Sequence, residues 1–407
     1  MAGMKNDGLV SRAIKVLSPA LSHYTTLEIE KGRGAYLISK DGKKYLDFAC
    51  GIAVTNLGHC HPKVVAAAVK QAESLIHACA GIVYYEANVL LAEKLSKICP
   101  GGLTMSFFCQ SGTEATEGSI KLAKYVKNKQ GIIAFQGGFH GRTLGALSVT
   151  TSKQKYRDHY EPLLPNIYIA PYSKENSLDE VEKILRSKQI AGVIVEPVQG
   201  EGGYIVPSKE FLSGLRNLCN KYEVLLIFDE VQTGFGRTGK MFACEHFGVY
   251  PDIMAVAKGI ASGFPLGAVI AKESVMMQWS PGAHGGTMSG NPVSCAASIA
   301  TIDIIEKEKL SEAAAKMGNY LKIKLERLKK NYPSIIDVRG LGLMIGVEFE
   351  EGNTVKQILE NCLKGGLILI SCGTRDQVIR FIPPLIITKE QIDTAVNIFE
   401  EALIGLS

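Results

Sequence analysis

The chain lacks long hydrophobic runs, clustered charge of one sign and paired cysteines. Nowhere do about 18 consecutive apolar residues occur, so no membrane-spanning helix is expected. Lys and Arg (45 residues) nearly balance Asp and Glu (40 residues), and no basic cluster with interleaved aromatics occurs, so nucleic-acid binding is not indicated. Residues 1–20 also lack the apolar core of a secretory signal. We therefore expect a cytoplasmic protein.

The ten cysteines show neither a CxxC pair nor a regular spacing. Most of them lie in apolar runs, where cysteine acts as a small buried hydrophobic residue. A reducing compartment is the simplest account of this pattern. His59, Cys60 and His61 are adjacent, but no second pair of ligands follows at a suitable spacing, so we expect no metal site.

Composition and length indicate a large globular protein. Hydrophobic residues make up 46% of the chain and charged residues 21%, which excludes a disordered protein. A length of 407 residues favours two domains, because one domain typically holds about 100–200 residues. No internal repeat or low-complexity linker is visible, so the domain limits have to come from the pattern of elements.

Apolar runs alternate with helical stretches in the middle of the chain. The runs are continuously apolar, as in strands that are covered on both faces. They lie at residues 105–109, 131–136, 166–170, 192–196, 224–229, 252–257 and 267–271. Helical stretches between them include residues 114–127, 178–187 and 209–222. This alternation predicts an α/β fold with a mostly parallel sheet of about seven strands between layers of helices.

The two ends of the chain carry different patterns. Residues 26–48 predict short strands, with turns at residues 31–34 and 41–42. The C-terminal part predicts helices at residues 302–331, 354–364 and 389–403 and strands at residues 335–339, 343–348, 367–370 and 378–381. We therefore predict a large domain at residues 56–295 and a smaller α/β domain at residues 296–407, with which an N-terminal segment at residues 1–55 packs.

Lys258 and Asp229 are the first candidates for chemistry. Asp229 ends one apolar run and Lys258 follows the next, so both are expected at one edge of the sheet, where open α/β sheets bind ligands. A lysine can form an imine with a carbonyl compound, and a carboxylate can keep a pyridine nitrogen protonated. These are the two requirements of pyridoxal phosphate (PLP). A lysine that is only a solvated strand end is the alternative.

Two loops after predicted strands could contact the same ligand. Residues 110–114 (QSGTE) open a helix whose free N–H groups and dipole suit an anion, although a plain Ser/Thr helix cap gives the same pattern. In the loop 136–143 (QGGFHGRT), Phe139 can lie flat on a ligand ring. Arg142 in that loop either grips a substrate carboxylate with two hydrogen bonds or faces solvent.

Two further glycine-rich loops are less specific. Residues 196–203 (EPVQGEGG) hold two carboxylates, Glu196 and Glu201, which could equally be structural partners of arginines. Residues 234–239 match the GxGxxG pattern letter for letter. A dinucleotide-binding loop should follow its strand at once and open a long helix, and here residues 229–233 intervene. We therefore do not predict a nicotinamide-dependent dehydrogenase.

Taken in order, these motifs resemble class III (ω-type) aminotransferases of the PLP fold-type I superfamily. The resemblance covers nearly the whole chain and rests on SGTEA (111–115), FHGRT (139–143), EPVQGEG (196–202), DEVQTGFGRTG (229–239), KGIASGFPL (258–266), HGGT (284–287), GNP (290–292) and RFIPPL (380–385). It implies a fold with a large domain and a small α/β domain, and PLP as the cofactor. A catalytically silent relative is not expected, since every cofactor position is occupied.

The resemblance also implies roles in cofactor binding. Lys258 holds PLP through an imine and then moves a proton, while Asp229 pairs with the protonated pyridine nitrogen. The other cofactor-binding residues that it implies are Ser111, Gly112 and Thr113 at the phosphate, Phe139 on the ring face, Gln232 near the ring hydroxyl, and His140. Thr287 is implied to reach the phosphate of the other subunit, so a homodimer is expected, with a tetramer as the alternative.

A second group of residues is implied to bind the substrate. Arg142 holds the carboxylate distal to the reacting amine, and Arg380 holds a second carboxylate when the substrate has one near the amine. Glu201 neutralises Arg380 for ω-amino acids, which have no such carboxylate, because an uncompensated buried charge costs roughly several kcal/mol. Glu196 and Ile52 complete the set.

Ile52 bears on the choice of donor. Ornithine-specific relatives carry a tyrosine there that helps to hold an α-amino group, so an apolar residue favours a donor without one. The resemblance is nearest to 4-aminobutyrate (GABA) aminotransferases, and we predict transfer from GABA to 2-oxoglutarate, giving succinate semialdehyde and glutamate. Acetylornithine, ornithine, 5-aminovalerate and β-alanine transaminases and some amino-acid racemases share most of the motifs. Met288 and Ser289, next to Thr287, depart from the family pattern at the expected subunit interface.

Overall fold

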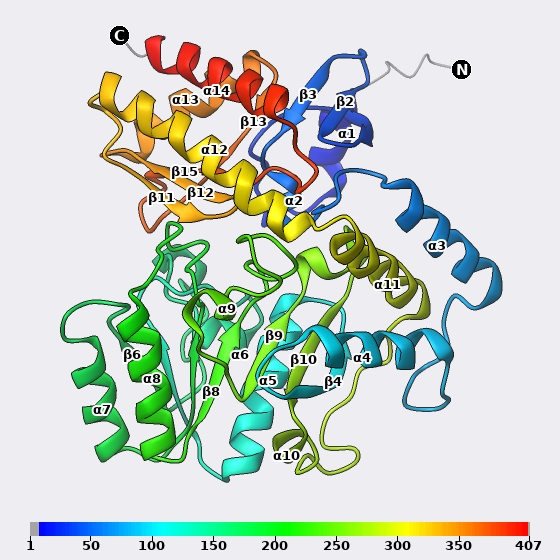
Figure 1. Cartoon of the computed structure of the whole chain (residues 1–407), viewed down its shortest axis with the longest axis vertical. Coiled ribbons are helices and arrows are strands. Elements are labelled where there is room, and N and C mark those ends of the chain that lie inside the picture. The colour runs from blue at the N-terminus through cyan, green and yellow to red at the C-terminus, as the bar shows by residue number, and fades with distance from the viewer. Residues whose placement is uncertain (1–7, 406–407) are drawn as a thin grey trace.

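A seven-stranded sheet forms the centre of the lower part of the molecule in Figure 1. The computed structural model describes residues 8–405. The strands are β4 (Leu103–Cys109), β5 (Gly131–Phe135), β6 (Ile167–Ala170), β7 (Ile190–Val195), β8 (Leu225–Asp229), β9 (Ile253–Val256) and β10 (Gly267–Lys272). Their order is β4-β10-β9-β8-β7-β5-β6, and β10 is antiparallel to both of its neighbours while the remaining pairs are parallel. Each strand coincides with a predicted apolar run, so the predicted α/β fold is confirmed.

Both faces of this sheet are covered, which explains why its strands are apolar throughout. Successive side chains of a strand point to opposite faces. In β7, Ile194 belongs to the hydrophobic cluster that includes α5 (Gly112–Lys127), whereas Val193 and Val195 belong to the cluster that includes α8 (Lys209–Lys221). The sheet is therefore a rigid central layer whose strand ends hold the loops that follow them.

Helices α5, α8 and α7 (Ser177–Ser187) confirm the predicted helical stretches between the strands. None of the helices before β4 was predicted, and the two longest of them, α3 (Pro62–Ser74) and α4 (Glu86–Ile98), both pack against α11 (Pro292–Lys307). α3 buries only Val64 and Ala68, so its apolar stripe is too narrow to give a clear helical period. The short elements of this part are α6 (Leu144–Ser148), η1 (Gln154–Tyr156), α9 (Cys244–Phe247), η2 (Lys258–Ala261) and α10 (Glu273–Met276).

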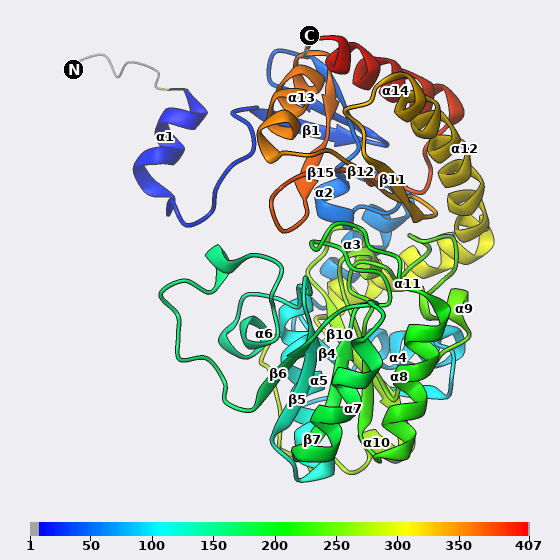
Figure 2. The same ribbon diagram turned by 90° about the vertical axis from the view of Figure 1, so that its left-hand side faces the viewer.

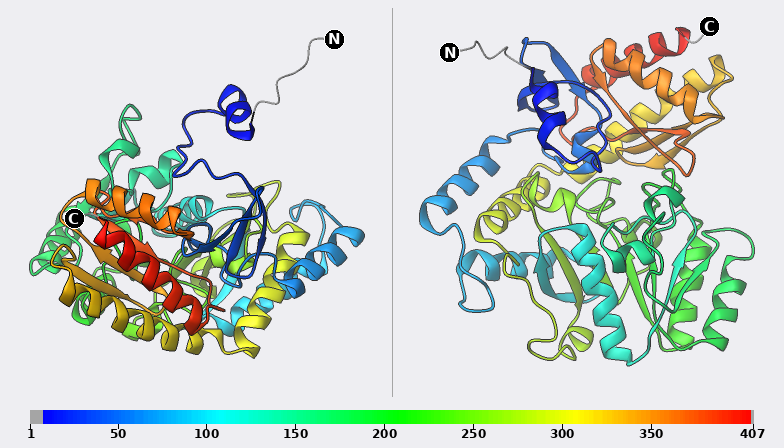
Figure 3. Two further views of the ribbon diagram at one scale, coloured as in Figure 1. Left: turned by 90° about the horizontal axis from the view of Figure 1, so that it is seen from above. Right: turned by 180° about the vertical axis from the view of Figure 1, so that it is seen from behind.

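Two smaller sheets form the upper part of the molecule. One joins β1 (Ile29–Arg33), β2 (Tyr36–Ser39), β3 (Lys44–Asp47) and β13 (Leu367–Ile368), and the other has the order β11 (Asp337–Leu341), β12 (Met344–Glu348), β15 (Val378–Phe381), β14 (Ile370–Cys372). Because β3 pairs in parallel with β13, the N-terminal strands lie beside the C-terminal elements, as both views of Figure 3 show. The domain limits at residues 55 and 295 stay predictions.

Three helices cover the upper sheets: α12 (Leu310–Asn331), α13 (Gly352–Lys364) and α14 (Lys389–Ile404). The single long helix predicted at residues 302–331 is wrong, because α11 ends at Lys307 and α12 is a separate helix. Lys309 lies between them with a φ of 50°, a left-handed conformation that ends the regular helical repeat. The predicted strand at residues 367–370 is likewise divided into β13 and β14.

The first helix, α1 (Leu9–Val16), has no buried residue and stands away from the rest of the chain in Figure 2. The parts of the N- and C-terminal predictions that concern residues 1–7 and 406–407 lie outside the described residues. Within residues 8–405, no helix has both the length and the apolar character needed to cross a membrane. All ten cysteines are free thiols, and the reducing compartment stays a prediction.

Candidate active site

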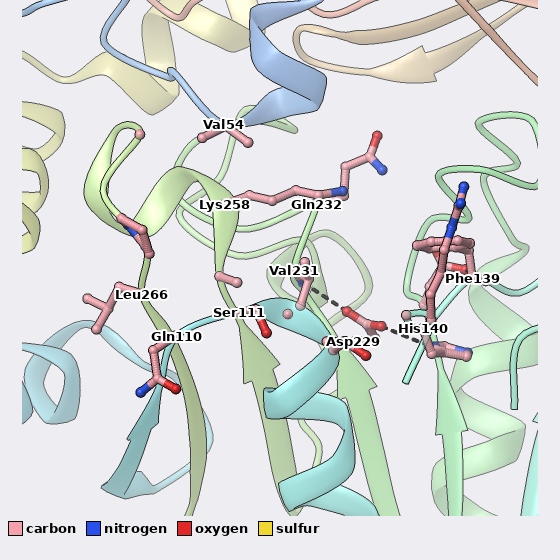
Figure 4. A pocket seen from close by; sticks show the side chains of 18 of the residues that line it. Val54, Gln110, Ser111, Phe139, His140, Asp229, Val231, Gln232, Lys258 and Leu266 are labelled. Atoms are coloured by element: carbon pink, nitrogen blue, oxygen red, sulfur yellow. Dashed lines mark hydrogen bonds and ion pairs between the residues drawn. The ribbon is translucent and has the colours of Figure 1, made fainter. Parts of the chain in front are cut away.

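A cavity of about 410 Å³ lies at the ends of the strands of the large sheet. Loops that follow β4, β5, β7, β8 and β9 line it, and Val54 from the N-terminal segment lies above them (Figure 4). Its volume is within the range of roughly 300–1,000 Å³ that is usual for small-molecule sites. The predicted site residues that line it are Ser111, Gly112, Thr113, Phe139, His140, Arg142, Glu196, Asp229, Gln232 and Lys258.

Lys258 is the first residue of η2, which one residue separates from β9, and its side chain extends across the cavity toward Gln232 in Figure 4. Its φ of 45° is uncommon for a residue with a side chain, and such strained backbone is concentrated at functional sites. Burial and the positive charge of Arg380 lower the pKa of Lys258 to about 8, against the opposing effect of Asp229. Its amine therefore becomes a neutral nucleophile far more readily than that of an exposed lysine.

Asp229 lies at the end of β8 with 5% of its surface exposed. Its Oδ2 is 2.7 Å from Nδ1 of His140, and its Oδ1 accepts a hydrogen bond of 3.0 Å from the Val231 N–H. Burial opposes protonation of His140, but the hydrogen bond and charge of Asp229 outweigh it and raise the histidine pKa. These contacts fix the carboxylate, which has further lone pairs for a cationic ring nitrogen in the cavity.

The loop after β4 forms both a helix cap and a place for an anion. Ser111 caps α5 by accepting a 3.3 Å hydrogen bond from the Glu114 N–H, and the Glu114 carboxylate accepts the Gln110 N–H at 2.7 Å. Gly112 and Thr113 stand in the first helical turn, where backbone N–H groups have no partner within the helix. A Cβ at Gly112 would lie 2.7 Å from Cγ1 of Val231, so glycine allows the loops after β4 and β8 to approach each other.

Glu196 joins the loops that follow β5 and β7. Its Oε1 accepts the Phe139 N–H and its Oε2 accepts the Gly200 N–H, both at 2.8 Å. Burial raises the pKa of Glu196, although the nearby His140 opposes this. Among the described residues Glu196 has no arginine as an ion-pair partner, so its visible role is to hold Phe139 at the cavity.

Arg142 is exposed at the edge of the cavity and rests on an aromatic ring. Its guanidinium carbon lies 4.1 Å from the ring centroid of Tyr156, and the Phe139 ring meets Tyr156 edge-on at 5.9 Å. A cation over an aromatic face is held in orientation without using its hydrogen-bond donors. The donors of Arg142 therefore stay free for a carboxylate.

Glu201 and Arg380 form the ion pair that the sequence led us to expect. Arg380 on β15 is 1% exposed, and its Nη1 lies 3.0 Å from Oε2 of Glu201. Burial opposes ionisation of Glu201, but Arg380 and Lys153 outweigh it and lower the glutamate pKa. The guanidinium donates from Nη2 to the Ser371 carbonyl at 2.5 Å, whereas its Nε and Nη1 have no hydrogen-bond acceptor within residues 8–405.

Four predicted site residues do not line the cavity: Ile52, Glu201, Thr287 and Arg380. Ile52 lies in α2 (Cys50–Ala53), a turn in which Cys50, Gly51, Ile52 and Ala53 have φ values of 53°, 61°, 66° and 62°. The Ile52 side chain is 41% exposed. Thr287 is also exposed and lies outside the cavity.

The loop 234–239 has a structural role that its GxGxxG pattern does not suggest. Arg237 is fully buried and donates hydrogen bonds to Oδ1 of Asn56 at 2.7 Å, to the Leu343 carbonyl at 3.2 Å and to the Pro383 carbonyl. The loop thus ties the large sheet to the N-terminal and C-terminal parts. No helix opens after it in the manner of a dinucleotide site, as its sequence context predicted.

Sequence reasoning missed Val54, Lys153 and Tyr156. Val54 lies two residues after Ile52, a predicted site residue, and could have been proposed from it. Lys153 and Tyr156 belong to SKQKYR (152–157), which reads as an ordinary charged surface stretch. Lys153 is in fact 5% exposed, and a lysine is rarely buried unless it is paired. No pattern in the sequence indicates that Lys153 is buried.

Known proteins share both the sequence and the fold of this chain. The family profile described as "Aminotransferase class-III" matches residues 18–403. The acetylornithine aminotransferase of Methanocaldococcus jannaschii is 46% identical over 91% of this chain and 92% of its own length. The 5-aminovalerate aminotransferase of Pseudomonas putida is 39% identical over 97% and 98%. An ornithine aminotransferase of Toxoplasma gondii, solved with partial occupancy of PLP, superposes with a TM-score of 0.90 at 29% identity, covering 97% and 94%.

Enzymes of this family use PLP, and the residues of the cavity fit it. Asp229 is a buried carboxylate positioned for a cationic ring nitrogen, Lys258 is an amine with a lowered pKa, and the first turn of α5 suits a phosphate. The expectation that GABA aminotransferases are the nearest relatives is not confirmed, because the relatives above are named for acetylornithine and 5-aminovalerate.

Proposed function

Because the chain belongs to the class-III aminotransferases, we propose that it transfers the terminal amino group of an ω-amino acid to 2-oxoglutarate, with N2-acetylornithine as the main donor. The products are an aldehyde and glutamate. The observation that carries this proposal is the convergence of Lys258 and the Asp229–His140 pair in one cavity of cofactor size.

The chemistry depends on Lys258 and Asp229. PLP, when bound, supplies an electron sink that makes a carbon–hydrogen bond next to the reacting nitrogen acidic. Nζ of Lys258 would hold the cofactor covalently and, when free, would accept and return the proton of that carbon. Asp229 would keep the ring nitrogen protonated, and His140 fixes the orientation of Asp229 through their 2.7 Å contact. The burial of Asp229, its contact with His140 and the lowered pKa of Lys258 support these roles.

The remaining cavity residues hold the cofactor. Ser111, Gly112 and Thr113 would hold its phosphate at the start of α5, where the helix dipole favours an anion. Phe139 would supply an aromatic face for the ring, and Gln232 would bind the ring hydroxyl. Gln232 is oriented by Tyr204, whose hydroxyl donates to Gln232 Oε1 at 2.9 Å.

Two arginines sort the substrates by the position of their carboxylates. Arg142 binds the carboxylate that is distal to the reacting amine. Arg380 binds the α-carboxylate of glutamate or 2-oxoglutarate and is neutralised by Glu201 when the substrate has none. The Nε and Nη1 atoms of Arg380 support this proposal, because neither donates a hydrogen bond and Nη1 has only its ionic contact with Glu201, so a substrate carboxylate would satisfy both atoms.

A second donor class has its own support. The 5-aminovalerate relative matches a larger share of both chains than the acetylornithine relative does, and 5-aminovalerate and GABA carry no group at the α position. Ile52 is apolar and exposed, which suits these donors and N2-acetylornithine alike, because none of them has a free α-amino group. These two unsubstituted ω-amino acids are therefore the alternative donors.

We also propose that the enzyme acts as a homodimer in which Thr287 completes the phosphate site of the partner. The exposure of Thr287 and of the apolar side chains Ile82 (81%), Tyr84 (97%) and Met288 (47%) supports this, because a large exposed apolar surface marks an interface. Light scattering measures the mass in solution, which we expect to be that of a dimer; the mass of a tetramer is the alternative. A monomer with full activity would end the proposal.

A donor panel tests the function. We expect glutamate to form from 2-oxoglutarate with N2-acetylornithine at a higher kcat/KM than with ornithine, GABA or 5-aminovalerate. A preference for GABA or 5-aminovalerate would favour the second candidate. Racemisation of an amino acid without consumption of 2-oxoglutarate would overturn the transaminase assignment.

A further inference from the structure

Lys153 is a buried cation that the proposed function leaves without a role. It precedes η1, is 5% exposed, and its Nζ lies 3.0 Å from Oε1 of Glu201 and 2.5 Å from Oδ1 of Asp376. These pairs and the charge of Glu201 raise the pKa of Lys153 despite its burial, so the side chain stays charged. Lysine is rarely buried unless it is paired, so the buried position of Lys153 depends on these two carboxylates.

The hydrogen bonds of Glu201 identify what holds it. Oε1 accepts from Lys153 Nζ at 3.0 Å and from the Tyr156 hydroxyl at 3.1 Å. Arg380 approaches the other oxygen, Oε2, at 3.0 Å, but Nη1 is not aligned for a hydrogen bond to it. Glu201 is therefore anchored on the Lys153 side and is only in ionic contact with Arg380.

Resting on the proposed function, we propose that Lys153 is a positioning residue for substrate selection: it compensates the charge of Glu201 while Arg380 binds an α-carboxylate. Without a second cation, release of Arg380 would leave Glu201 as a buried anion supported by one phenol. With Lys153 in place, the carboxylate keeps an ion pair and two hydrogen bonds on Oε1 whichever way Arg380 is engaged.

Lys153 should therefore favour one class of ligand. A ligand with a single distal carboxylate leaves the Arg380–Glu201 contact intact and gains nothing from Lys153. A ligand with a second carboxylate near the reacting end has to draw Arg380 away from Glu201, and Lys153 lowers the cost of that separation. If Lys153 has this role, its removal should weaken the binding of ligands with two carboxylates much more than the binding of ligands with one.

A purely structural role for Lys153 is the competing explanation. Asp376 lies in the turn between β14 and β15, so the Lys153–Asp376 pair connects the upper part of the molecule to the large-sheet part. Lys155 also approaches Asp376, at 3.6 Å, but its side chain is 63% exposed. Loss of a strut between the two parts would weaken every ligand of the cavity alike.

The test uses Lys153→Met in the holoenzyme and two unreactive ligands, glutarate and butyrate, with binding measured by calorimetry. Glutarate has a carboxylate at each end, and butyrate has only one. We expect the Kd of glutarate to rise about tenfold and that of butyrate to stay within about twofold, since tenfold corresponds to the loss of about one charge-assisted hydrogen bond.

Two variants serve as matched controls. Lys155→Met makes the same chemical change at an exposed position, and Asp376→Asn removes the strut while leaving the Lys153–Glu201 pair. Both should leave the ratio of the two Kd values unchanged, and Lys153→Arg should restore most of it. Equal weakening of both ligands by Lys153→Met, or no change in either, would overturn the inference. Failure of the wild type to bind glutarate would instead count against the proposed function.

Discussion

The Asp229–His140 pair and the Glu201 cluster lie in one site but are built in different ways. Asp229 is the last residue of β8 and His140 lies in the loop after β5, so the backbone of one sheet sets their separation. Glu201 and Lys153 belong to the large-sheet part, whereas Arg380 and Asp376 belong to the β14–β15 hairpin. The first group is held by a rigid layer, and the second spans two parts of the molecule.

This difference matches the two tasks of the proposed enzyme, which are to activate the cofactor and to distinguish between substrates. The partners of Asp229 are a histidine at 2.7 Å and a backbone N–H at 3.0 Å, and nothing in the proposed cycle asks it to exchange them. Glu201 instead has two cations on opposite oxygens, so one can leave without stranding its charge. A group that works identically on every substrate is best fixed, whereas a group that distinguishes substrates needs a second partner.

The largest effect expected in the site is that of Lys258→Ala. Removing the amine removes both the covalent attachment of PLP and the group that moves the proton, so kcat should fall by at least about 10⁴-fold, the upper range for one acid–base group. Steady-state assays with donor and 2-oxoglutarate measure it. Circular dichroism should show an unchanged fold, and sustained multiple turnover by this variant would contradict the mechanism.

The same contrast explains what the sequence could and could not predict. The strands of the large sheet were all predicted because both of its faces are covered, which leaves continuous apolar runs such as 224–229. Asp229 and Lys258 could be placed together because the ends of neighbouring strands share an edge. Lys153 was missed because its partners, Glu201 and Asp376, are 48 and 223 residues away in the chain. When residues far away in the chain bury a side chain, the sequence around that side chain shows no sign of it.

Asp229→Asn should have the next largest effect, because it keeps the shape of the side chain and removes its charge. An opposite charge at contact distance shifts a pKa by about 1–3 units, so loss of the carboxylate should lower kcat by about 10- to 1,000-fold through weaker protonation of the ring nitrogen. The bound cofactor should also change its visible absorption. A variant with normal kcat would show that the fixed pair is not needed for catalysis.

Glu201→Ala should act on the ratio of the two half-reactions. Arg380 would then be a buried cation without a counter-ion, at a cost of about 3–5 kcal/mol that an incoming α-carboxylate can offset but an ω-amino donor cannot. We expect the half-reaction with the ω-amino donor to slow about 10- to 100-fold more than that with glutamate, as measured in single-turnover experiments. Equal slowing of the two half-reactions would show that Glu201 does not distinguish between the two substrates.

The smallest effect is a pH dependence of cofactor uptake, which reports on Lys258 and on its electrostatic coupling to Arg380. The neutral amine of Lys258 is the form that captures PLP, and its pKa is lowered to about 8. Between pH 7 and pH 9 the neutral fraction then rises about tenfold and levels off, whereas an ordinary lysine near 10.4 would gain about a hundredfold and keep rising. The rate of covalent capture of PLP by the apoenzyme, followed by absorbance, measures this dependence.

Arg380→Met removes one of the charges that lower the Lys258 pKa, so the pH at which the capture rate levels off should rise. An unchanged value would mean that the two halves of the site are electrostatically independent.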